Sequence, residues 1–358
     1  MAKSVKALVE PELLVWARKS SGYSLEVVAK RISVKPERLE SWETGKDKPT
    51  IKQLRKIGNV YKRPIAVFYL PTPPKDFAPM KDFRRLSRQI AGIESPQLRL
   101  EIRRAHDRRG IALELYEELE GELPIFSVKA SLSDNPEDLA VKIRSSLGIS
   151  YDNQLKFRND YDALNRWRTA LENIGVLTFQ TTRVETSEMR GFSISDPPFP
   201  IIVLNNKDAV RGRIFTMLHE FVHIMLRDGG ICDLGEYGLS PEKQRVEVFC
   251  NRVAGETLVP GNYLNQEDLV LKKIRGADWL DEEIVELADQ YHVSREVILR
   301  RLLINGYTTN QFYKRKIKEY EKEYEVLEKK PRKGGPEQHV LAISRSGKSF
   351  VRLVLNNY

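Results

Sequence analysis

The chain has 358 residues and a net charge of +9, so it has room for two or three domains and suits a nucleic-acid partner. It contains no apolar run of roughly eighteen residues and no apolar signal segment at its start, so neither a membrane span nor a secretory signal is expected. Cys232 and Cys250 are the only cysteines, which argues against a disulfide framework and favours the cytoplasm.

Residues 1–72 are predicted to form a five-helix domain of the helix-turn-helix kind. The helices expected from apolar spacing cover 11–22, 24–32, 35–45, 50–62 and 65–70. Ser24 is expected to cap the second helix, while Pro36 lies near the start of the third and Gly45 just past its end. Ala29 is small enough to let the third helix approach the second, as a helix-turn-helix requires.

A proline-rich connector and a helical linker are predicted over 73–130. The stretch LPTPPKDFAPM places four prolines in eleven residues, which favours an extended chain and a domain boundary. From residue 81 to about residue 120 the sequence is charged and is predicted to be helical.

A change in residue composition predicts a small sheet and several helices over 131–262. The expected elements are, in order, helices at 135–148 and 161–175, strands at 176–184, 189–195 and 199–205, and helices at 208–230 and 241–259. The strands are short, rich in β-branched or aromatic residues, and interrupted by Gly and Pro. Pro260 ends the last helix.

Helices are expected to dominate the C-terminal region. Residues 263–310 are predicted to form a second unit like a helix-turn-helix, which has Ser294 as a cap and packs against the preceding domain. The remaining elements, within 311–358, are a charged helix over 312–330 and a hairpin formed by 339–344 and 349–357. The fold class expected for the chain is therefore α+β and mostly helical.

The helix predicted over 208–230 carries LHEFVHIML, in which two of the five histidines of the chain lie four residues apart. Residues i and i+4 share one face of a helix, so His219 and His223 can both reach one zinc ion. Glu220 points about 100° away around the helix, where it can take a proton from a water on the metal. The motif therefore predicts a hydrolytic zinc site.

Two core histidines satisfied by hydrogen bonds are the alternative interpretation. A chance HExxH in a chain with five histidines has odds on the order of 1 in 100, so metal binding is favoured. Spacing alone leaves the third ligand open between Glu247, Glu242 and Glu256 on the next predicted helix. The other histidines lie far along the chain, at His106, His292 and His339.

The sequence around these residues resembles the ImmA/IrrE family of zinc metallopeptidases. RIFTMLHEFVHIML is similar to the HExxH helix of the family, and EVFCNRVAGETLVP to its second motif. The matching positions of the second motif are Glu247, Asn251, Ala254 and Pro260. The resemblance implies a zincin-like domain in which His219, His223 and Glu247 bind zinc and Glu220 is the catalytic base. Cys250 stands where the family has Ala, a position expected to be buried.

The N-terminal residues separately resemble the Xre/Cro family of helix-turn-helix regulators, through Trp42, Gly45 and Pro49 in the pattern W-x-x-G-x-x-x-P. The third predicted helix would then be the recognition helix. The residues expected to reach bases or phosphates are Lys35, Arg38, Ser41, Lys46 and Lys48, with Lys52 and Arg55 nearby. Glutamates in the same helix would repel phosphates, so docking onto a protein such as a related repressor is the alternative to DNA binding.

These features predict a cytoplasmic zinc-dependent endopeptidase that carries a regulator-type helix-turn-helix. The resemblance implies a protein substrate, namely a transcriptional repressor or another regulatory protein. Tyr237 is a candidate for stabilising the oxyanion. The alternative function is a DNA-binding regulator whose metal site senses or stabilises and cuts nothing. Glu220 favours the enzyme, because a purely structural zinc site has no use for a base.

Overall fold

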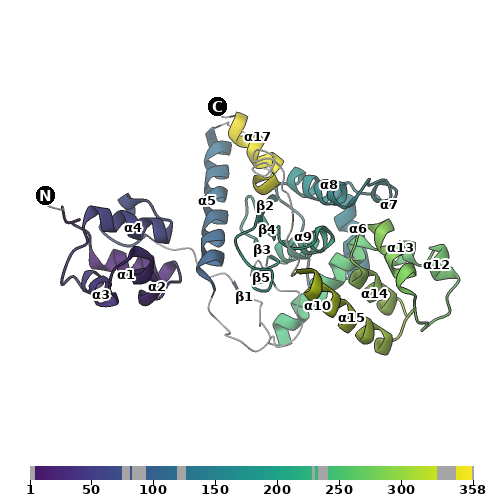
Figure 1. Cartoon of the computed structure of the whole chain (residues 1–358). Helices are drawn as coiled ribbons and strands as arrows, with labels where there is room; N and C mark the ends of the chain where they lie inside the picture. Colours follow the sequence, from purple (N-terminus) through teal and green to yellow (C-terminus); the bar gives the residue numbers. More distant parts are fainter. Residues whose placement is uncertain are drawn as a thin grey trace. The chain divides into compact units, whose positions relative to one another are not determined.

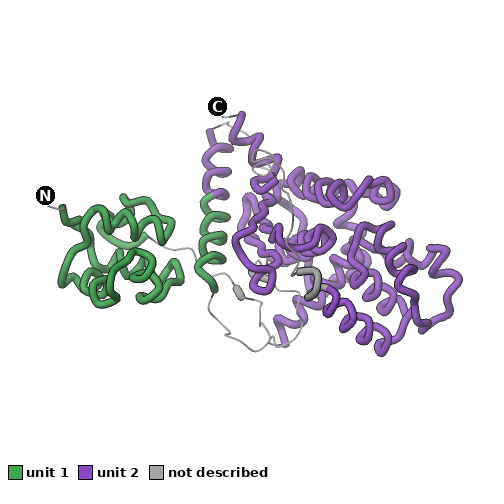
Figure 2. The backbone as a smooth tube through the Cα atoms, in the orientation of Figure 1, with its two compact units in different colours: residues 1–79, 90–107 green, residues 80–89, 108–358 purple. Residues whose placement is uncertain are grey.

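The computed structural model describes residues 5–74, 81–82, 94–118, 126–227, 230–232, 241–328 and 344–356. For 81–82, 230–232 and 324–328 it describes the backbone alone. The fold is α+β and mostly helical, as predicted. The chain divides into two compact units, one of residues 1–79 and 90–107 and the other of residues 80–89 and 108–358 (Figure 2).

Residues 5–74, the described N-terminal part of the first unit, form four α-helices and a short 3₁₀ helix. They are α1 (Pro11–Ser20), α2 (Leu25–Ile32), α3 (Pro36–Glu43), α4 (Ile51–Tyr61) and η1 (Ile65–Tyr69). The predicted Ser24 cap of α2 is present, since its side chain accepts a hydrogen bond from the Val27 backbone. Ala29 and Leu39 are buried where α2 and α3 pack together, as a helix-turn-helix requires. The fifth predicted helix is correct in place but is a 3₁₀ helix of one to two turns.

A five-stranded sheet lies in the second unit, with the strand order β1-β5-β3-β4-β2. The strands are β1 (Lys81–Asp82), β2 (Leu177–Thr181), β3 (Gly191–Ile194), β4 (Ile201–Asn205) and β5 (Gly230–Cys232). Strand β2 runs parallel to β4, and β3 runs antiparallel to both β4 and β5. All residues of β2, β3 and β4 are buried, so both faces of this part of the sheet are covered.

The three predicted strands are confirmed, but two more were missed. Residues 81–82 were predicted to be helical and instead form β1, which pairs parallel with β5. Strands of two and three residues are too short to show an alternating pattern, so sequence periodicity could not reveal them. The helix expected from residue 81 onward begins, in the described part of the chain, with α5 (Pro96–Glu118).

Helix α9 (Val210–Met225) packs against strands β3 and β4 of the sheet (Figure 1). Every residue from Thr216 to Met225 is buried. Two neighbours, α8 (Asp160–Asn173) and α10 (Pro241–Leu258), cover α9 further. Helix α6 (Pro136–Leu147) packs in turn on α10, and the short α7 (Tyr151–Gln154) precedes α8. The residues of LHEFVHIML therefore lie in the centre of this unit.

Further helices follow α10. They are α11 (Gly261–Leu264), α12 (Asp268–Leu271), α13 (Asp281–Tyr291), α14 (Arg295–Ile304), α15 (Asn310–Glu328) and α17 (Lys348–Asn356). The predicted Ser294 cap of α14 is present, and the α13–α14 pair shares the hydrophobic core that contains α9 and α10. The terminal hairpin was wrong in its second strand, because residues 348–356 form α17, which packs against α8. Residues 339–343 of the predicted first strand lie outside the described residues.

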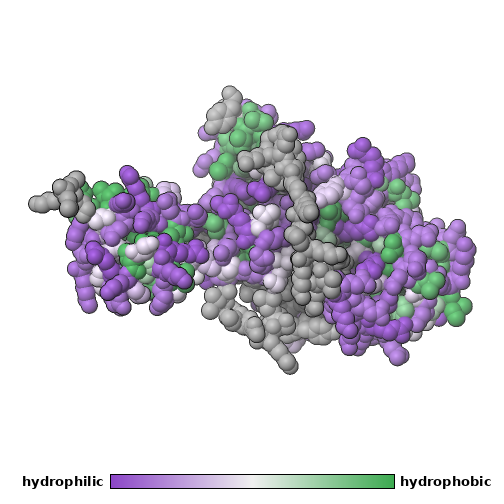
Figure 3. All heavy atoms as spheres, in the orientation of Figure 1, coloured by the Kyte–Doolittle hydropathy of each residue, from purple (hydrophilic) through white to green (hydrophobic). Residues whose placement is uncertain are grey.

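The face of the molecule seen in Figure 3 is mostly hydrophilic, with hydrophobic residues in scattered groups. Scattered apolar residues are normal on protein surfaces and do not by themselves mark a site. Among the described helices, none combines the length and the apolar character needed to cross a bilayer. The buried polar groups of the core are therefore the candidates for a functional site.

Candidate functional site

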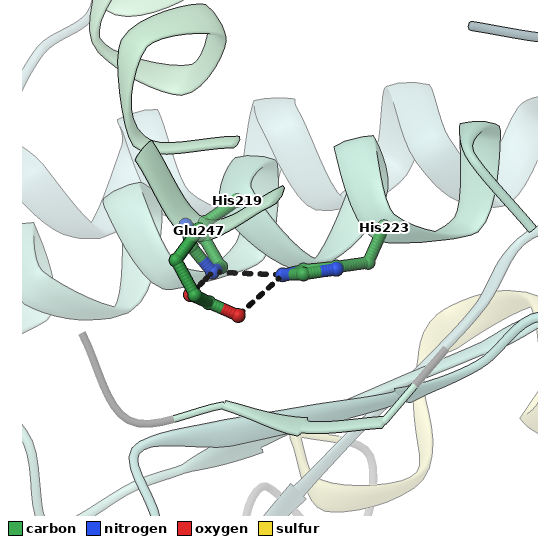
Figure 4. A group of neighbouring side chains, drawn as sticks. All are labelled: His219, His223 and Glu247. Carbon is green, nitrogen blue, oxygen red and sulfur yellow. Dashed lines mark hydrogen bonds and ion pairs between the residues drawn. The ribbon is translucent and has the colours of Figure 1, made fainter. Parts of the chain in front are cut away.

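His219, His223 and Glu247 form a buried group between α9 and α10 (Figure 4). Both histidines have an exposed fraction of 0% and Glu247 of 1%. The Nε2 atoms of the histidines are 3.1 Å apart. Oε2 of Glu247 lies 3.2 Å from Nε2 of His219, and Oε1 lies 3.3 Å from Nε2 of His223. The packing of α10 on α9 thus brings the third residue to the histidine pair.

The distances within this group are close to those between ligand atoms that share one zinc ion. A tetrahedral zinc ion with bonds of about 2.0–2.1 Å holds its ligand atoms about 3.3 Å apart. The two nitrogens are 3.1 Å apart, and each lies 3.2 to 3.3 Å from a different oxygen of Glu247. One ligand atom from each of the three residues lies within 4.8 Å of the other two. Two imidazoles and one carboxylate are also a donor set that zinc accepts in catalytic sites. The residues present therefore suit a zinc ion with a fourth position left for water.

Burial and charge pairing have opposite effects on the pKa values of Glu247 and His219. Burial alone would raise the pKa of Glu247, but its contacts with the two histidines outweigh burial and lower that pKa to about 2. Burial alone would lower the pKa of His219, yet the Glu247 carboxylate reverses this and the pKa is raised. Glu247 therefore stays ionised at neutral pH, as a metal ligand must.

Glu220 lies on the same helix but outside the ligand group, and it is also 0% exposed. Burial raises the pKa of its carboxyl group, against the attraction of His219 and His223. A carboxylate with a raised pKa binds a proton more readily than an ordinary one, which suits a general base. The role of general base for Glu220 stays a prediction.

Ser193 is a member of the site that sequence reasoning missed. Its hydroxyl donates a hydrogen bond of 2.7 Å to Oε2 of Glu220, and both side chains are fully buried. Ser193 lies on β3, which packs against α9. Asn251, one turn after Glu247 on α10, adjoins His219 and favours its protonated form through a side-chain hydrogen bond.

The competing ligand candidates do not join the group. Glu256 is buried in an ion pair with Arg301 of α14, and Glu242 is exposed at the start of α10. His292 is not part of the group and contacts Asp160 at 2.9 Å. Cys250 is buried but is not part of the ligand group, whereas Tyr237 and His339 lie outside the described residues.

The five residues predicted to contact DNA lie on or beside α3. Arg38 and Ser41 are on the helix, Lys35 is the residue just before it, and Lys46 and Lys48 are on the loop that follows. Lys35, Arg38, Lys46 and Lys48 are exposed, while Ser41 is half-buried. Arg38 lies 4.0 Å from a carboxylate oxygen of Asp47, and the Ser41 hydroxyl donates to the Arg38 carbonyl oxygen at 2.7 Å. The surface of α3 thus carries cations that are in part already paired.

The acidic residues of α3 have two different environments. Glu37 and Glu40 are exposed on the same helix as Arg38. Glu43 instead points inward and forms a salt bridge of 2.8 Å with Arg18 of α1. Two of the three glutamates therefore remain on the surface that would face DNA, and the choice between DNA and protein stays open on geometry.

Two parts of the chain match known protein families. Residues 172–303, which include β2–β5, α9 and α10, match a peptidase family described as an IrrE N-terminal-like domain. Residues 14–68 match a family described as a helix-turn-helix. The chain carries a helix-turn-helix and an IrrE N-terminal-like domain.

The match to the IrrE N-terminal-like domain contains the whole ligand group and extends to the last turn of α14. At the level of the family it identifies this part of the chain as a peptidase domain, and the resemblance described from the sequence is confirmed. The comparison with curated proteins found no match to the chain.

Proposed function

We propose that the chain is a zinc-dependent endopeptidase of the cytoplasm whose protein substrate is a transcriptional repressor or another regulatory protein. The observation that supports this most directly is the buried triangle of residues His219, His223 and Glu247, whose side chains contact one another at 3.1 to 3.3 Å. A second buried carboxylate, Glu220, follows His219 on the same helix. A structural site would need a fourth protein ligand, and no such group adjoins the triangle among the described residues. The family match supports hydrolysis of peptide bonds.

Zinc, when bound, supplies a Lewis acid that polarises a peptide carbonyl and lowers the pKa of a coordinated water to about 7. His219, His223 and Glu247 would hold it. Glu220 takes one proton from the attacking water and passes that proton to the departing amine. Its raised pKa favours the uptake of the proton, because burial makes the carboxylate a stronger base than an exposed one.

The helix-turn-helix supports a regulatory target. Its exposed cations Lys35, Lys46 and Lys48 could hold DNA phosphates, while Arg38 and Ser41 of α3 could reach base edges. This domain would deliver the peptidase to an operator or to the repressor bound there. Glu37 and Glu40 keep direct docking on a protein as the competing use of the same helix.

Glu220→Gln tests the proposed reaction. The amide has nearly the shape of the carboxylate and can still accept the Ser193 hydrogen bond, but it cannot take up a proton. Cleavage of a repressor encoded beside this gene, scored on co-expression, should fall by at least about 10²-fold. Glu242→Gln makes the same change on an exposed glutamate of α10 and should cleave as the wild type does. Undiminished cleavage by Glu220→Gln would refute the mechanism.

A DNA-binding regulator that cuts nothing is the second candidate. It is favoured by one observation, the complete burial of His219, Glu220 and His223, since a peptide must reach these groups to be cut. The same co-expression experiment discriminates the two. A wild-type protein that holds zinc and binds DNA, yet cleaves none of the neighbouring repressors, would support the regulator.

A further inference from the structure

The two oxygens of the Glu220 carboxylate have different surroundings. Oε2 accepts the Ser193 hydroxyl at 2.7 Å. Oε1 is buried and has no hydrogen-bond partner within the described part of the chain. A buried carboxylate oxygen without a partner is costly, because it has lost water and gained nothing in return. Such an atom is expected where a ligand or a water completes the site.

We propose that Ser193 is a positioning residue that fixes the Glu220 carboxylate through Oε2 and so reserves Oε1 for the attacking water. This inference rests on the proposed peptidase function. Ser193 touches neither substrate nor metal in this role. It acts by limiting the rotation of the Glu220 side chain, which has three rotatable bonds and, among the described residues, no other hydrogen bond to hold it.

The backbone of β3 explains why a serine can reach Glu220. Residues i and i+2 of a strand face the same side, so Gly191 and Ser193 both face α9. A Cβ on Gly191 would lie 2.5 Å from Cγ2 of Thr216 and 3.5 Å from Cγ of Glu220. Only glycine therefore lets β3 approach α9 this closely. In the sequence Gly-Phe-Ser, the glycine thus allows β3 to lie close to α9, and the serine hydroxyl is then near enough to bond to Glu220.

The hydrogen bond is of a kind that orients strongly. Its acceptor carries charge when Glu220 is ionised, and charge-assisted hydrogen bonds are about twice as strong as neutral ones. It lies in a region from which water is excluded, since both partners are 0% exposed. If the Ser193 hydroxyl is removed, water should therefore not take its place, and the Glu220 side chain should adopt other rotamers.

Crystal structures of the zinc-free protein test the positioning directly. In Ser193→Ala the Glu220 carboxylate should leave its wild-type position or occupy several. Ser193→Thr keeps the hydroxyl and should restore the position. Thr216→Val is the matched control, because it removes a buried hydroxyl near β3 that has no hydrogen-bond partner among the described residues. Glu220 in its wild-type position in Ser193→Ala would overturn the proposal, whatever the function of the site.

Binding of acetohydroxamate to the zinc-loaded protein, measured by calorimetry, tests the consequence. This probe coordinates zinc through two oxygens and places its hydroxyl group where a general base can accept the proton. Ser193→Ala should weaken the binding about 10-fold, while Ser193→Thr and Thr216→Val should stay within about 2-fold of the wild type. Unchanged affinity in Ser193→Ala would contradict the positioning role.

Glu220→Gln separates this proposal from the proposed function. If it binds acetohydroxamate as tightly as the wild type, Glu220 is not the base and the peptidase mechanism fails. The zinc-free structures would still decide whether Ser193 holds the side chain. If Glu220→Gln binds weakly while Ser193→Ala binds normally, the base is correct and the role of Ser193 is wrong.

Discussion

Alanine at position 191 is expected to push β3 away from α9. A Cβ built on Gly191 lies 2.5 Å from Cγ2 of Thr216 and 3.2 Å from the carbonyl oxygen of Val203. Carbon atoms in contact prefer a separation of about 3.5 to 4.0 Å, so the strand or the helix must shift by about 1 Å. Overpacking of this kind in a core costs about 1–3 kcal/mol of folding free energy.

Thr216→Ser isolates the steric cause, because it removes the methyl group that a Cβ at position 191 would meet. With that methyl absent, the nearest remaining atom is the Val203 carbonyl oxygen at 3.2 Å, which needs a movement of only a few tenths of an ångström. Thr216→Ser alone should cost about 1 kcal/mol for one buried methyl group. The double variant should therefore lose less than the sum of the two single variants, with a coupling free energy of at least about 1 kcal/mol.

Amide hydrogen exchange of peptides that span β3 and β4 measures these differences in the full chain. A cost of about 1–3 kcal/mol should raise the exchange of Gly191→Ala about 5- to 150-fold under conditions where exchange follows opening. Wild-type exchange in Gly191→Ala would refute the steric reasoning. A double variant whose loss equals the sum of the single losses would refute the assignment of the contact to Thr216.

In the zinc-free protein, the pairing of His219 with Glu247 should make the stability highest between about pH 4.5 and 6.5. The lowered pKa of Glu247 stabilises the fold at pH values above the ordinary 4.5, and this contribution is lost as the pH falls toward about 2. The raised pKa of His219 stabilises the fold at pH values below the ordinary 6.5, and this contribution is lost as the pH rises through the raised value. Thermal melts after chelation, from roughly pH 3 to 9, should show this maximum, and a stability that rises steadily with pH would contradict it. Arg301→Met should lower the free energy of unfolding by about 3–5 kcal/mol, because it leaves Glu256 buried without a counter-charge. Urea unfolding of the double variant Arg301→Met/Glu256→Leu should show that most of this loss is recovered, and a double variant as unstable as Arg301→Met would contradict the ion pair. Lys46→Ala should reduce the slope of log affinity against log salt on bound DNA by about 0.9, and an unchanged slope would remove Lys46 from the interface.

The histidine pair was predictable because its geometry is local. Residues i and i+4 share a helix face in any helix, so the spacing of His219 and His223 needed no knowledge of the tertiary fold. The third residue is different, because three glutamates on the next helix were compatible with spacing. The packing of α10 on α9 decides among them, and before the structure only the family resemblance pointed to Glu247.

Ser193 could not be predicted, because its partner is reached across a sheet–helix interface. The only hint was Gly191 two residues earlier, a glycine within a strand, which can mark a close backbone approach.

The wrong prediction of a strand at the C-terminus has a different cause. Phe350, Leu353 and Val354 share one helix face, but the Val-rich segment fits a strand equally well. Packing of α17 on α8 and the hydrogen bonds from Ser349 to Glu172 favour the helix.

The metal content of the purified protein tests the central claim most directly. Mass spectrometry of the dialysed wild type should find one zinc per chain, and Glu247→Ala should lose most of it. Glu242→Ala, which changes an exposed glutamate on the same helix, should keep it. Near-stoichiometric zinc in a folded His219→Ala/His223→Ala double variant would contradict the account, because no metal could then depend on the buried triangle.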